Sequence, residues 1–109
     1  MLTKKEAQQK VEQYTQLFQP LLNVPIRLTF GKFNIEQVVI TELRMPKVSE
    51  ITIDKRIKPD GNGQYTPLVM EIVTNEGKLL FIIEDAQVAA IVNGIRIDIG
   101  TTKVEMRKM

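Results

Sequence analysis

The first twenty residues carry apolar side chains at the spacing of an amphipathic α-helix. The apolar positions recur every three or four residues and form a single stripe, Ala7, Val11, Tyr14 and Phe18. Thr3 followed by Glu6 is typical of a capping box at a helix N-terminus. Pro20 disfavours a helical conformation at the residue before it. The pattern therefore predicts one helix that ends or kinks near Pro20.

After Pro25 the apolar period changes to two, which is typical of β-strands. This alternation predicts strands within 26–30, 35–45, 51–57 and 103–107, the last burying Val104 and Met106. Within 35–45 the alternation changes phase, which predicts a β-bulge or bend near Thr41 and Glu42. Residues 58–64 contain Pro, Asp, Asn and two glycines, and this composition predicts a long loop.

Residues 67–84 predict a β-hairpin with a surplus of apolar side chains. Two strands, 67–74 and 78–84, flank Asn75-Glu76-Gly77, a spacing that suits a three-residue turn with Gly77 at positive φ. One face of the first strand carries Met70 and Ile72, yet the other face is also apolar, and the second strand is apolar on both faces. Such a hairpin exposes an apolar patch unless another element covers it.

We expect the N-terminal helix to cover the outer face of this hairpin, which is formed by Val69, Val73, Leu80 and Ile82. Exposure of either the helix stripe or this face to water is unfavourable, and an isolated helix of this length has only marginal stability. The alternative is that a second subunit contacts the same four side chains. In either case these residues are the candidate interaction surface.

Residues 86–92 are compatible with either a helix or a strand. Two helical turns between Asp85 and Gly94 are one reading, and a hairpin with Asn93-Gly94 as a type I′ turn is the other. The hairpin is favoured because it gathers apolar residues on one face. It places Val92 opposite Ile95, Ala90 opposite Ile97 and Val88 opposite Ile99.

Together these elements predict an α+β fold in a single domain spanning residues 1–109. An N-terminal amphipathic helix precedes a mostly antiparallel meander of six to eight short strands, which forms a small barrel or a sandwich. The alternation predicts a core that contains Leu28, Ile53, Met70, Ile72, Phe81, Ile95 and Ile97.

The amino-acid composition restricts the possible catalytic chemistry more than it restricts the fold. The chain has no histidine and no cysteine, so disulfides, Ser-His and Cys-His catalysis and zinc sites built on these residues are excluded. Neither a secretory signal nor a membrane-spanning apolar run is visible. The cytoplasm is therefore the expected location. A net charge of +2 is too small to indicate an acidic partner.

Motifs for cofactors and metals are weak. Gly61-Asn62-Gly63 lacks the third glycine and the following helix of a dinucleotide-binding turn, and no Walker-type Gly-Lys-Ser/Thr is present. Asp60 and Asn62 do not have the ligand spacing of an EF-hand. Glu84-Asp85 is an adjacent carboxylate pair, which is best explained as a strand end. We therefore expect no catalytic, cofactor-binding or metal-binding residues.

The basic residues suggest a nucleic-acid interface as an alternative. This set combines cations with one aromatic ring and consists of Lys55, Arg56, Lys58, Tyr65, Lys103 and Arg107. Small barrels with basic strands and loops bind nucleic acid through phosphate contacts and base stacking. Against this, aromatic residues make up only 6% of the chain, and Asp54 and Asp60 interrupt the cluster.

The expected function is a non-enzymatic domain that binds another macromolecule, most readily a protein or a second copy of itself. A nucleic-acid-binding barrel is the alternative. An enzyme that uses carboxylates or lysines is the least favoured hypothesis.

Overall fold

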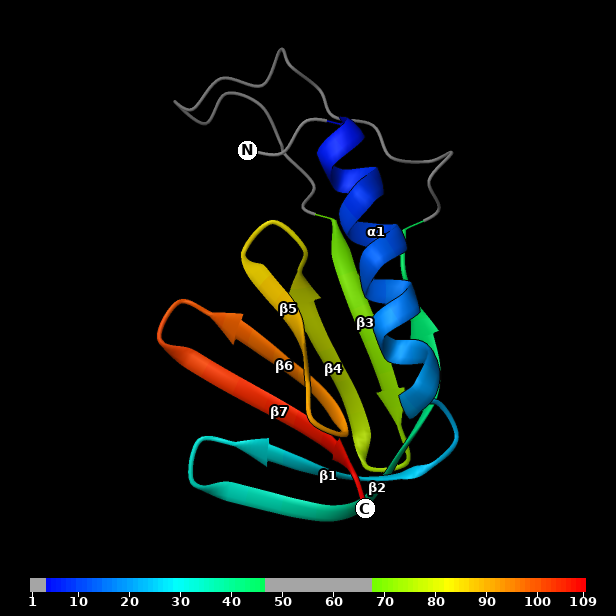
Figure 1. Ribbon diagram of the computed structural model, residues 1–109, viewed down its shortest axis with the longest axis vertical. Helices are drawn as coiled ribbons and strands as arrows, with labels where there is room; N and C mark the ends of the chain where they lie inside the picture. The colour runs from blue at the N-terminus through cyan, green and yellow to red at the C-terminus, as the bar shows by residue number, and fades with distance from the viewer. Residues whose placement is uncertain (1–3, 47–67) are drawn as a thin grey trace.

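The computed structural model describes residues 4–46 and 68–109. In this part of the chain, one α-helix and one short 3-10 helix precede seven strands (Figure 1). The elements are α1 (Lys4–Phe18), η1 (Gln19–Leu21), β1 (Pro25–Phe30), β2 (Phe33–Arg44), β3 (Val69–Thr74), β4 (Gly77–Ile82), β5 (Ala86–Ile91), β6 (Gly94–Ile99) and β7 (Thr102–Lys108). The predicted strand over 51–57, the loop over 58–64 and the cap residue Thr3 lie outside the described residues.

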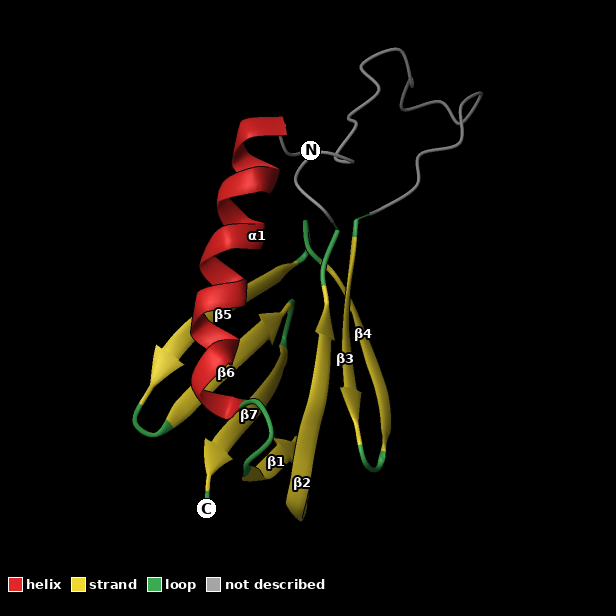
Figure 2. Cartoon of the chain, turned by 90° about the vertical axis from the view of Figure 1, so that its right-hand side faces the viewer, coloured by secondary structure: helices red, strands yellow, loops and turns green. Residues whose placement is uncertain are grey.

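The strands form one antiparallel sheet with the order β4-β3-β2-β1-β7-β6-β5. This arrangement confirms the predicted α+β class and the antiparallel meander. The sheet is not closed into a barrel, because β4 and β5 are its two edges. It folds over so that β5, β6, β7 and β1 lie on one side and β3 and β4 on the other (Figure 2).

The long strand β2 joins these two sides and is irregular at two places. Its first half pairs with β1 and its second half pairs with β3. An extra residue, Thr41, interrupts the pairing with β3, which confirms the predicted bulge. A second bulge precedes it, where Gln37 adopts a φ of 61°. Bulges bend and twist a strand, so β2 can serve both sides of the folded sheet.

The core lies on the concave side of the folded sheet, against α1 (Figure 2). The helix stripe of Ala7, Val11, Tyr14 and Phe18 is buried there, as its spacing predicted. Six of the seven predicted core residues are also buried, namely Leu28, Met70, Ile72, Phe81, Ile95 and Ile97. Ile53 lies outside the described residues. The predicted burial of Val104 and Met106 in the last strand is confirmed as well.

The expectation that α1 covers the outer face of the 67–84 hairpin is wrong. Leu80 is 64% exposed, and Val69 and Ile82 are 38% and 39% exposed, while Val73 is half-buried. The helix shares its core instead with the opposite face of the hairpin, which includes Met70 and Phe81. The bulges in β2 make that face concave, and only from the concave side can one helix contact both halves of a folded sheet.

The predicted hairpin over 86–99 forms, but its register differs from the expected one. Val88 lies opposite Ile97 and Ala90 opposite Ile95, so that Val92 falls in the turn and is exposed. Asn93 takes the positive φ of the turn, whereas Gly94 belongs to β6. There, an added Cβ would overlap the carbonyl oxygen of Met106 and lie 2.8 Å from Arg107 Cα. Gly94 is thus needed for the close approach of β7 and not for the turn.

The hairpin over 67–84 has a shorter turn than expected. Thr74 pairs with Gly77, which leaves two residues between the paired positions, and Gly77 has the predicted positive φ, at 140°.

In the described part of the chain, neither helix has the length and apolar character that crossing a membrane requires.

Candidate functional site

The outer face of the β3–β4 hairpin carries the four residues of the candidate interaction surface, which we call the hairpin patch. The pairing brings Val69 directly opposite Ile82, and Leu80 follows two residues away on the same face. These three side chains therefore form a contiguous apolar surface. Val73 lies further along β3, opposite Lys78, and is separated from the others by Glu71. The structure thus places all four predicted residues on one face and brings three of them together.

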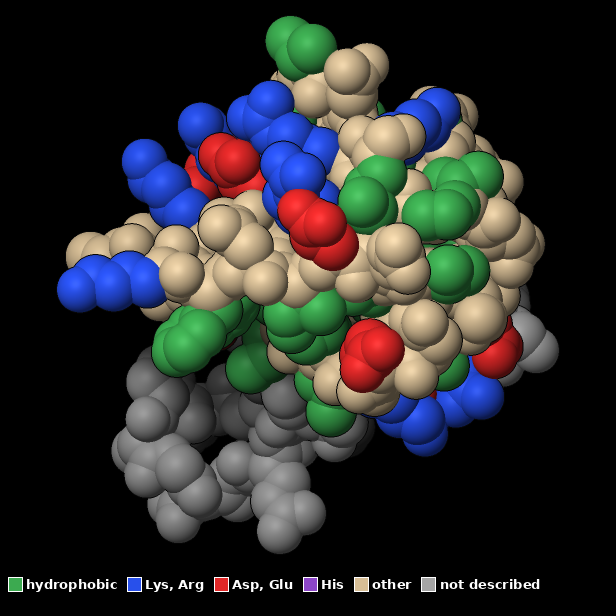
Figure 3. All heavy atoms as spheres, turned by 90° about the horizontal axis from the view of Figure 1, so that it is seen from below, with side chains coloured by type: hydrophobic (Ala, Val, Ile, Leu, Met, Phe, Trp, Pro, Cys, Tyr) green, Lys and Arg blue, Asp and Glu red, His purple; other side chains and the backbone are tan. Residues whose placement is uncertain are grey.

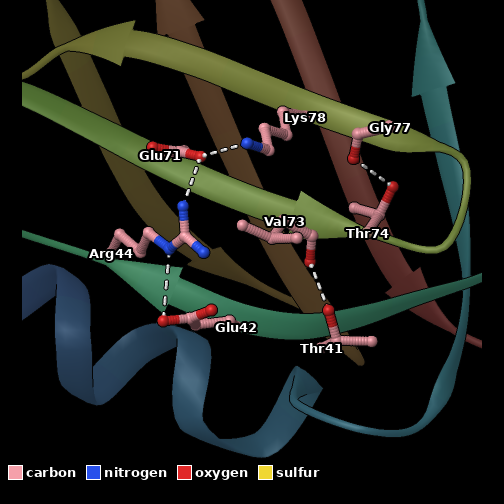
Figure 4. A network of polar contacts seen from close by, with 8 residues as sticks. All are labelled: Thr41, Glu42, Arg44, Glu71, Val73, Thr74, Gly77 and Lys78. Atoms are coloured by element: carbon pink, nitrogen blue, oxygen red, sulfur yellow. Dashed lines mark hydrogen bonds and ion pairs between the residues drawn. The ribbon is translucent and has the colours of Figure 1, made fainter.

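Charged side chains border the hairpin patch on the side of β2 (Figure 4). Glu71 accepts from Arg44 Nη1 at 3.2 Å and lies 3.5 Å from the Lys78 ammonium, while Arg44 Nε lies 3.2 Å from Glu42. The hydrogen bond with Glu42 and the negative charges of Glu42 and Glu71 raise the pKa of Arg44. The outer face of the hairpin is therefore apolar at one end and ionic at the other.

The backbone of β4 adds hydrogen-bonding groups to the hairpin patch. Antiparallel pairs alternate between those that exchange hydrogen bonds and those that do not. Ile83 N donates to Leu68 O at 2.9 Å, which fixes this alternation. Consequently Lys78, Leu80 and Ile82 direct their backbone N–H and C=O groups away from β3. Since β3 is the one described strand beside β4, these groups face a free edge, although the Ile82 C=O already accepts from Asp85 N at 3.1 Å.

The other edge of the sheet, β5, is covered by α1. The Tyr14 hydroxyl donates to Ala86 O at 2.9 Å in a buried position, and the Val88 backbone hydrogen-bonds the same phenol. Burial raises the pKa of Tyr14, and the Val88 hydrogen bond offsets part of this effect. Lys10 Nζ also donates to Ile83 O in the turn before β5 at 3.5 Å. A helix over a sheet edge is a common protection against unwanted strand pairing.

A second exposed apolar cluster was not predicted from the sequence. Phe33, Phe30 and Ile35 are 73%, 48% and 44% exposed, and we call them the tip patch because Phe30 and Phe33 flank the β1–β2 turn. Figure 3 shows apolar side chains exposed at this end of the molecule, with basic groups around them. In the sequence, the apolar residues Phe30, Phe33 and Ile35 lie on either side of Gly31-Lys32, which indicates a hairpin. This pattern does not show how far the helix covers that hairpin.

The basic set is only partly described. Lys55, Arg56, Lys58 and Tyr65 lie outside the described residues. Lys103 and Arg107 lie on β7, where carboxylates accompany both cations: Lys103 is opposite Asp98, and Arg107 contacts Glu105 at 3.3 Å. Lys103 and Phe30 both line a groove at the tip of the sheet, but Phe30 pairs with Val104, so the side chains of Lys103 and Phe30 leave the sheet on opposite faces.

The Glu84-Asp85 pair forms the turn between β4 and β5. Asp85 N donates to Ile82 O at 3.1 Å, and Asp85 is exposed while Glu84 is half-buried. Glu84 Oε1 is buried and makes no hydrogen bond to the described residues. Across 4–46 and 68–109, no three Asp or Glu side chains are grouped so that they could hold a metal ion.

Comparisons with protein-family models, with curated proteins and with solved structures gave no match to this chain.

Proposed function

We propose that this chain is a non-enzymatic, cytoplasmic protein-binding module, and that the hairpin patch and the free edge of β4 form its binding surface. The observation that carries the proposal is the coincidence of these two features in one strand. Leu80 is the most exposed residue of the hairpin patch, and its backbone groups also face the free edge. The absence of histidine and cysteine from the sequence supports binding over catalysis.

The geometry favours recognition of an extended segment. A strand that pairs with β4 would satisfy its outward N–H and C=O groups, and main-chain hydrogen bonds supply affinity in this mode. Side chains of the added strand would lie beside Leu80 and Ile82, whose burial contributes about 25 cal/mol per Å² of apolar area. A long apolar edge is otherwise a hazard for aggregation, and sequences usually protect such edges.

A peptide selection tests this proposal. Random peptides of about twelve residues, long enough to span an edge strand, are displayed on phage and selected against the immobilised chain. We expect selected peptides to slow hydrogen exchange at the amides of Lys78 and Leu80, and to bind Leu80→Lys at least about tenfold more weakly, a loss of ~1.4 kcal/mol. Phe33→Lys is the matched control and should bind normally, because it changes an exposed apolar residue elsewhere.

Two outcomes would contradict the protein-binding proposal. Either no peptide is enriched, or the enriched peptides bind Leu80→Lys as tightly as the unaltered chain.

Nucleic-acid binding is the second candidate, because Lys103 and the exposed Phe30 both line the groove at the tip of the sheet. Single-stranded DNA of about 30 nucleotides is the probe, since stacking and phosphate contacts need no sequence preference. If this candidate holds, affinity falls steeply with salt, and both Lys103→Glu and Phe30→Ala weaken it while Leu80→Lys does not. Absence of binding at low salt would eliminate this candidate.

A further inference from the structure

We infer that the partner at the free edge of β4 is a second copy of this chain, which pairs with it antiparallel through a two-fold axis at Leu80. This inference rests on the proposed binding surface and names its occupant. In such a dimer, the two β4 strands would join the two sheets into one continuous sheet.

The direction of the outward backbone groups limits the ways in which two copies can pair. Lys78, Leu80 and Ile82 face the free edge, so these residues must lie opposite one another across the axis. With the axis at Leu80, the two Leu80 residues exchange both of their backbone hydrogen bonds. Each Lys78 then lies opposite Ile82 of the second copy. The interface is self-complementary, as a two-fold axis requires.

The charges along β4 favour this register. Lys78 is the second residue of the strand, and the acidic turn residues Glu84 and Asp85 follow the strand's end. Antiparallel pairing about Leu80 brings the basic start of each strand beside the acidic end of the other. If the axis moved one residue towards Lys78, the two Lys78 side chains would become diagonal neighbours, and like charges at such positions are unfavourable. In this register each Lys78 lies diagonally across from Glu84 of the second copy, so the charges favour antiparallel pairing and disfavour an axis nearer Lys78.

The apolar side chains support the same arrangement. Leu80 of one copy would contact Leu80 of the other at the centre, and the two Ile82 side chains would extend the contact on either side. These are the exposed residues of β4 on the outer face. The ion pairs of Arg44 and Lys78 with Glu71 border this strip and would form its polar rim. An apolar centre with a charged rim is the usual composition of protein interfaces.

The opposite edge of the sheet cannot form the same contact. The outward groups of β5 at Ala86 and Val88 already bind the Tyr14 hydroxyl beneath α1. Strand addition at this end of β5 is thereby blocked, and pairing of two copies at β4 uses the free edges of both. The assembly therefore closes as a dimer and does not extend into a fibre.

Sedimentation equilibrium and cysteine cross-linking test the inference. The unaltered chain is expected to show a concentration-dependent monomer–dimer equilibrium, and Leu80→Lys is expected to raise the dimer dissociation constant at least about tenfold. The matched control, Phe33→Lys, is expected to leave the dissociation constant unchanged. Circular dichroism spectra of both variants should match the unaltered chain, because both positions are exposed.

Cross-linking locates the axis without changing the charge. The chain contains no cysteine, so Leu80→Cys introduces a single thiol. Residues that exchange both hydrogen bonds have Cα atoms about 5.5 Å apart, which suits a disulfide. Mild oxidation should therefore convert Leu80→Cys into a covalent dimer many times faster than Phe33→Cys, whose thiol is at least as exposed and reports random collisions.

The possible results separate this inference from the proposed function. A chain that stays monomeric, or a dimer in which Leu80→Cys cross-links no faster than Phe33→Cys, overturns the second copy as partner. Peptides that protect β4 in the selection experiment would still support protein binding in that case. If no peptide is enriched and the chain is a dimer with rapid Leu80→Cys cross-linking, the second copy is retained and binding of other proteins is discarded.

Discussion

The two edges of the sheet differ although they are formed by neighbouring segments, β4 and β5, joined by the turn Ile83-Glu84-Asp85. At β5, a side chain from α1 binds both a carbonyl and an amide of the edge strand, and the contact is buried. At β4, no described strand or helix covers the edge, and an exposed leucine lies beside it. Within the described residues, the polar backbone is thus covered at one edge and uncovered at the other.

This difference shows how one helix divides the sheet into a part that it buries and a part that it leaves exposed. The helix uses its apolar stripe to fill the concave side and its tyrosine to bind the β5 edge. It cannot also reach the convex face of the β3–β4 hairpin. We therefore expect substitutions near β5 to change the free energy of unfolding, and substitutions at β4 to change association.

The largest effect on stability is expected for Phe18→Ala. Phe18 is fully buried where α1 meets the sheet, and truncation of a buried aromatic side chain costs ~3–5 kcal/mol. Urea unfolding followed by circular dichroism measures the loss. The control is Phe33→Ala, the same chemical change at a residue that is 73% exposed, for which a change within about 0.5 kcal/mol is expected. Equal losses for both variants would contradict the burial of Phe18 between α1 and the sheet.

Tyr14→Phe removes the cover of the β5 edge but keeps the aromatic ring. The substitution leaves the Ala86 carbonyl and the Val88 amide without their phenolic partner in a buried position, at a cost of ~1–3 kcal/mol. Hydrogen exchange at Val88 should also become faster. For comparison, Thr29→Val removes a hydroxyl hydrogen bond to Asn34 at the surface and should cost less than about 1 kcal/mol. A Tyr14→Phe variant as stable as the unaltered chain would show that the edge needs no cover.

The raised pKa of Tyr14 predicts a smaller effect that depends on pH. Burial holds this pKa above its ordinary value of 10.0, so the phenol ionises first in the unfolded chain as the pH rises. Tyr14 contributes fully to the free energy of unfolding below pH 10, and this contribution is lost as the pH rises towards the pKa of Tyr14 in the folded state. The difference in unfolding free energy between the unaltered chain and Tyr14→Phe should therefore narrow as the pH rises above about 10. A constant difference would contradict this account.

The smallest stability effect is expected at the open edge. Leu80→Ala shortens a side chain that is 64% exposed, and surface substitutions of this kind change unfolding free energy by about 0.5 kcal/mol or less. Urea unfolding at a protein concentration well below the dimer dissociation constant measures the monomer alone. A loss of several kcal/mol would show that Leu80 belongs to the core and would remove the contrast between the two edges.

The periodicity of the sequence predicted much of the fold because it is a local property. The 3.6-residue spacing of Ala7, Val11, Tyr14 and Phe18 identified both the helix and its buried face. Alternation identified Met70, Ile72, Phe81, Ile95 and Ile97 as core residues, and the change of phase near Thr41 located a bulge.

The candidate site was predicted less completely. The 67–84 hairpin has apolar residues on both faces, so burial of one face leaves Leu80 and Ile82 exposed on the other. This surplus identified the hairpin patch. The tip patch was missed, since the sequence does not show where α1 ends relative to the strands beneath it. The register of the 86–99 hairpin was also missed. In the structure Asn93 takes the positive φ of the turn, and Gly94 lies in β6 where a Cβ would overlap the backbone at Met106 and Arg107, a contact between strands that the turn motif does not reveal.

The sequence by itself determined which segments are helix and strand, which residues share a face, and which catalytic chemistries are excluded by the lack of histidine and cysteine. Only the tertiary structure decided which of the two apolar faces of the β3–β4 hairpin lies in the core, and which edge of the sheet stays open. Both outcomes depend on the curvature of the sheet, which the bulges in β2 produce and which determines the side that α1 can reach. The bulge near Thr41 could be read from the local pattern, but the direction in which the sheet folds also depends on pairing between strands far apart in the chain, which a local pattern does not encode.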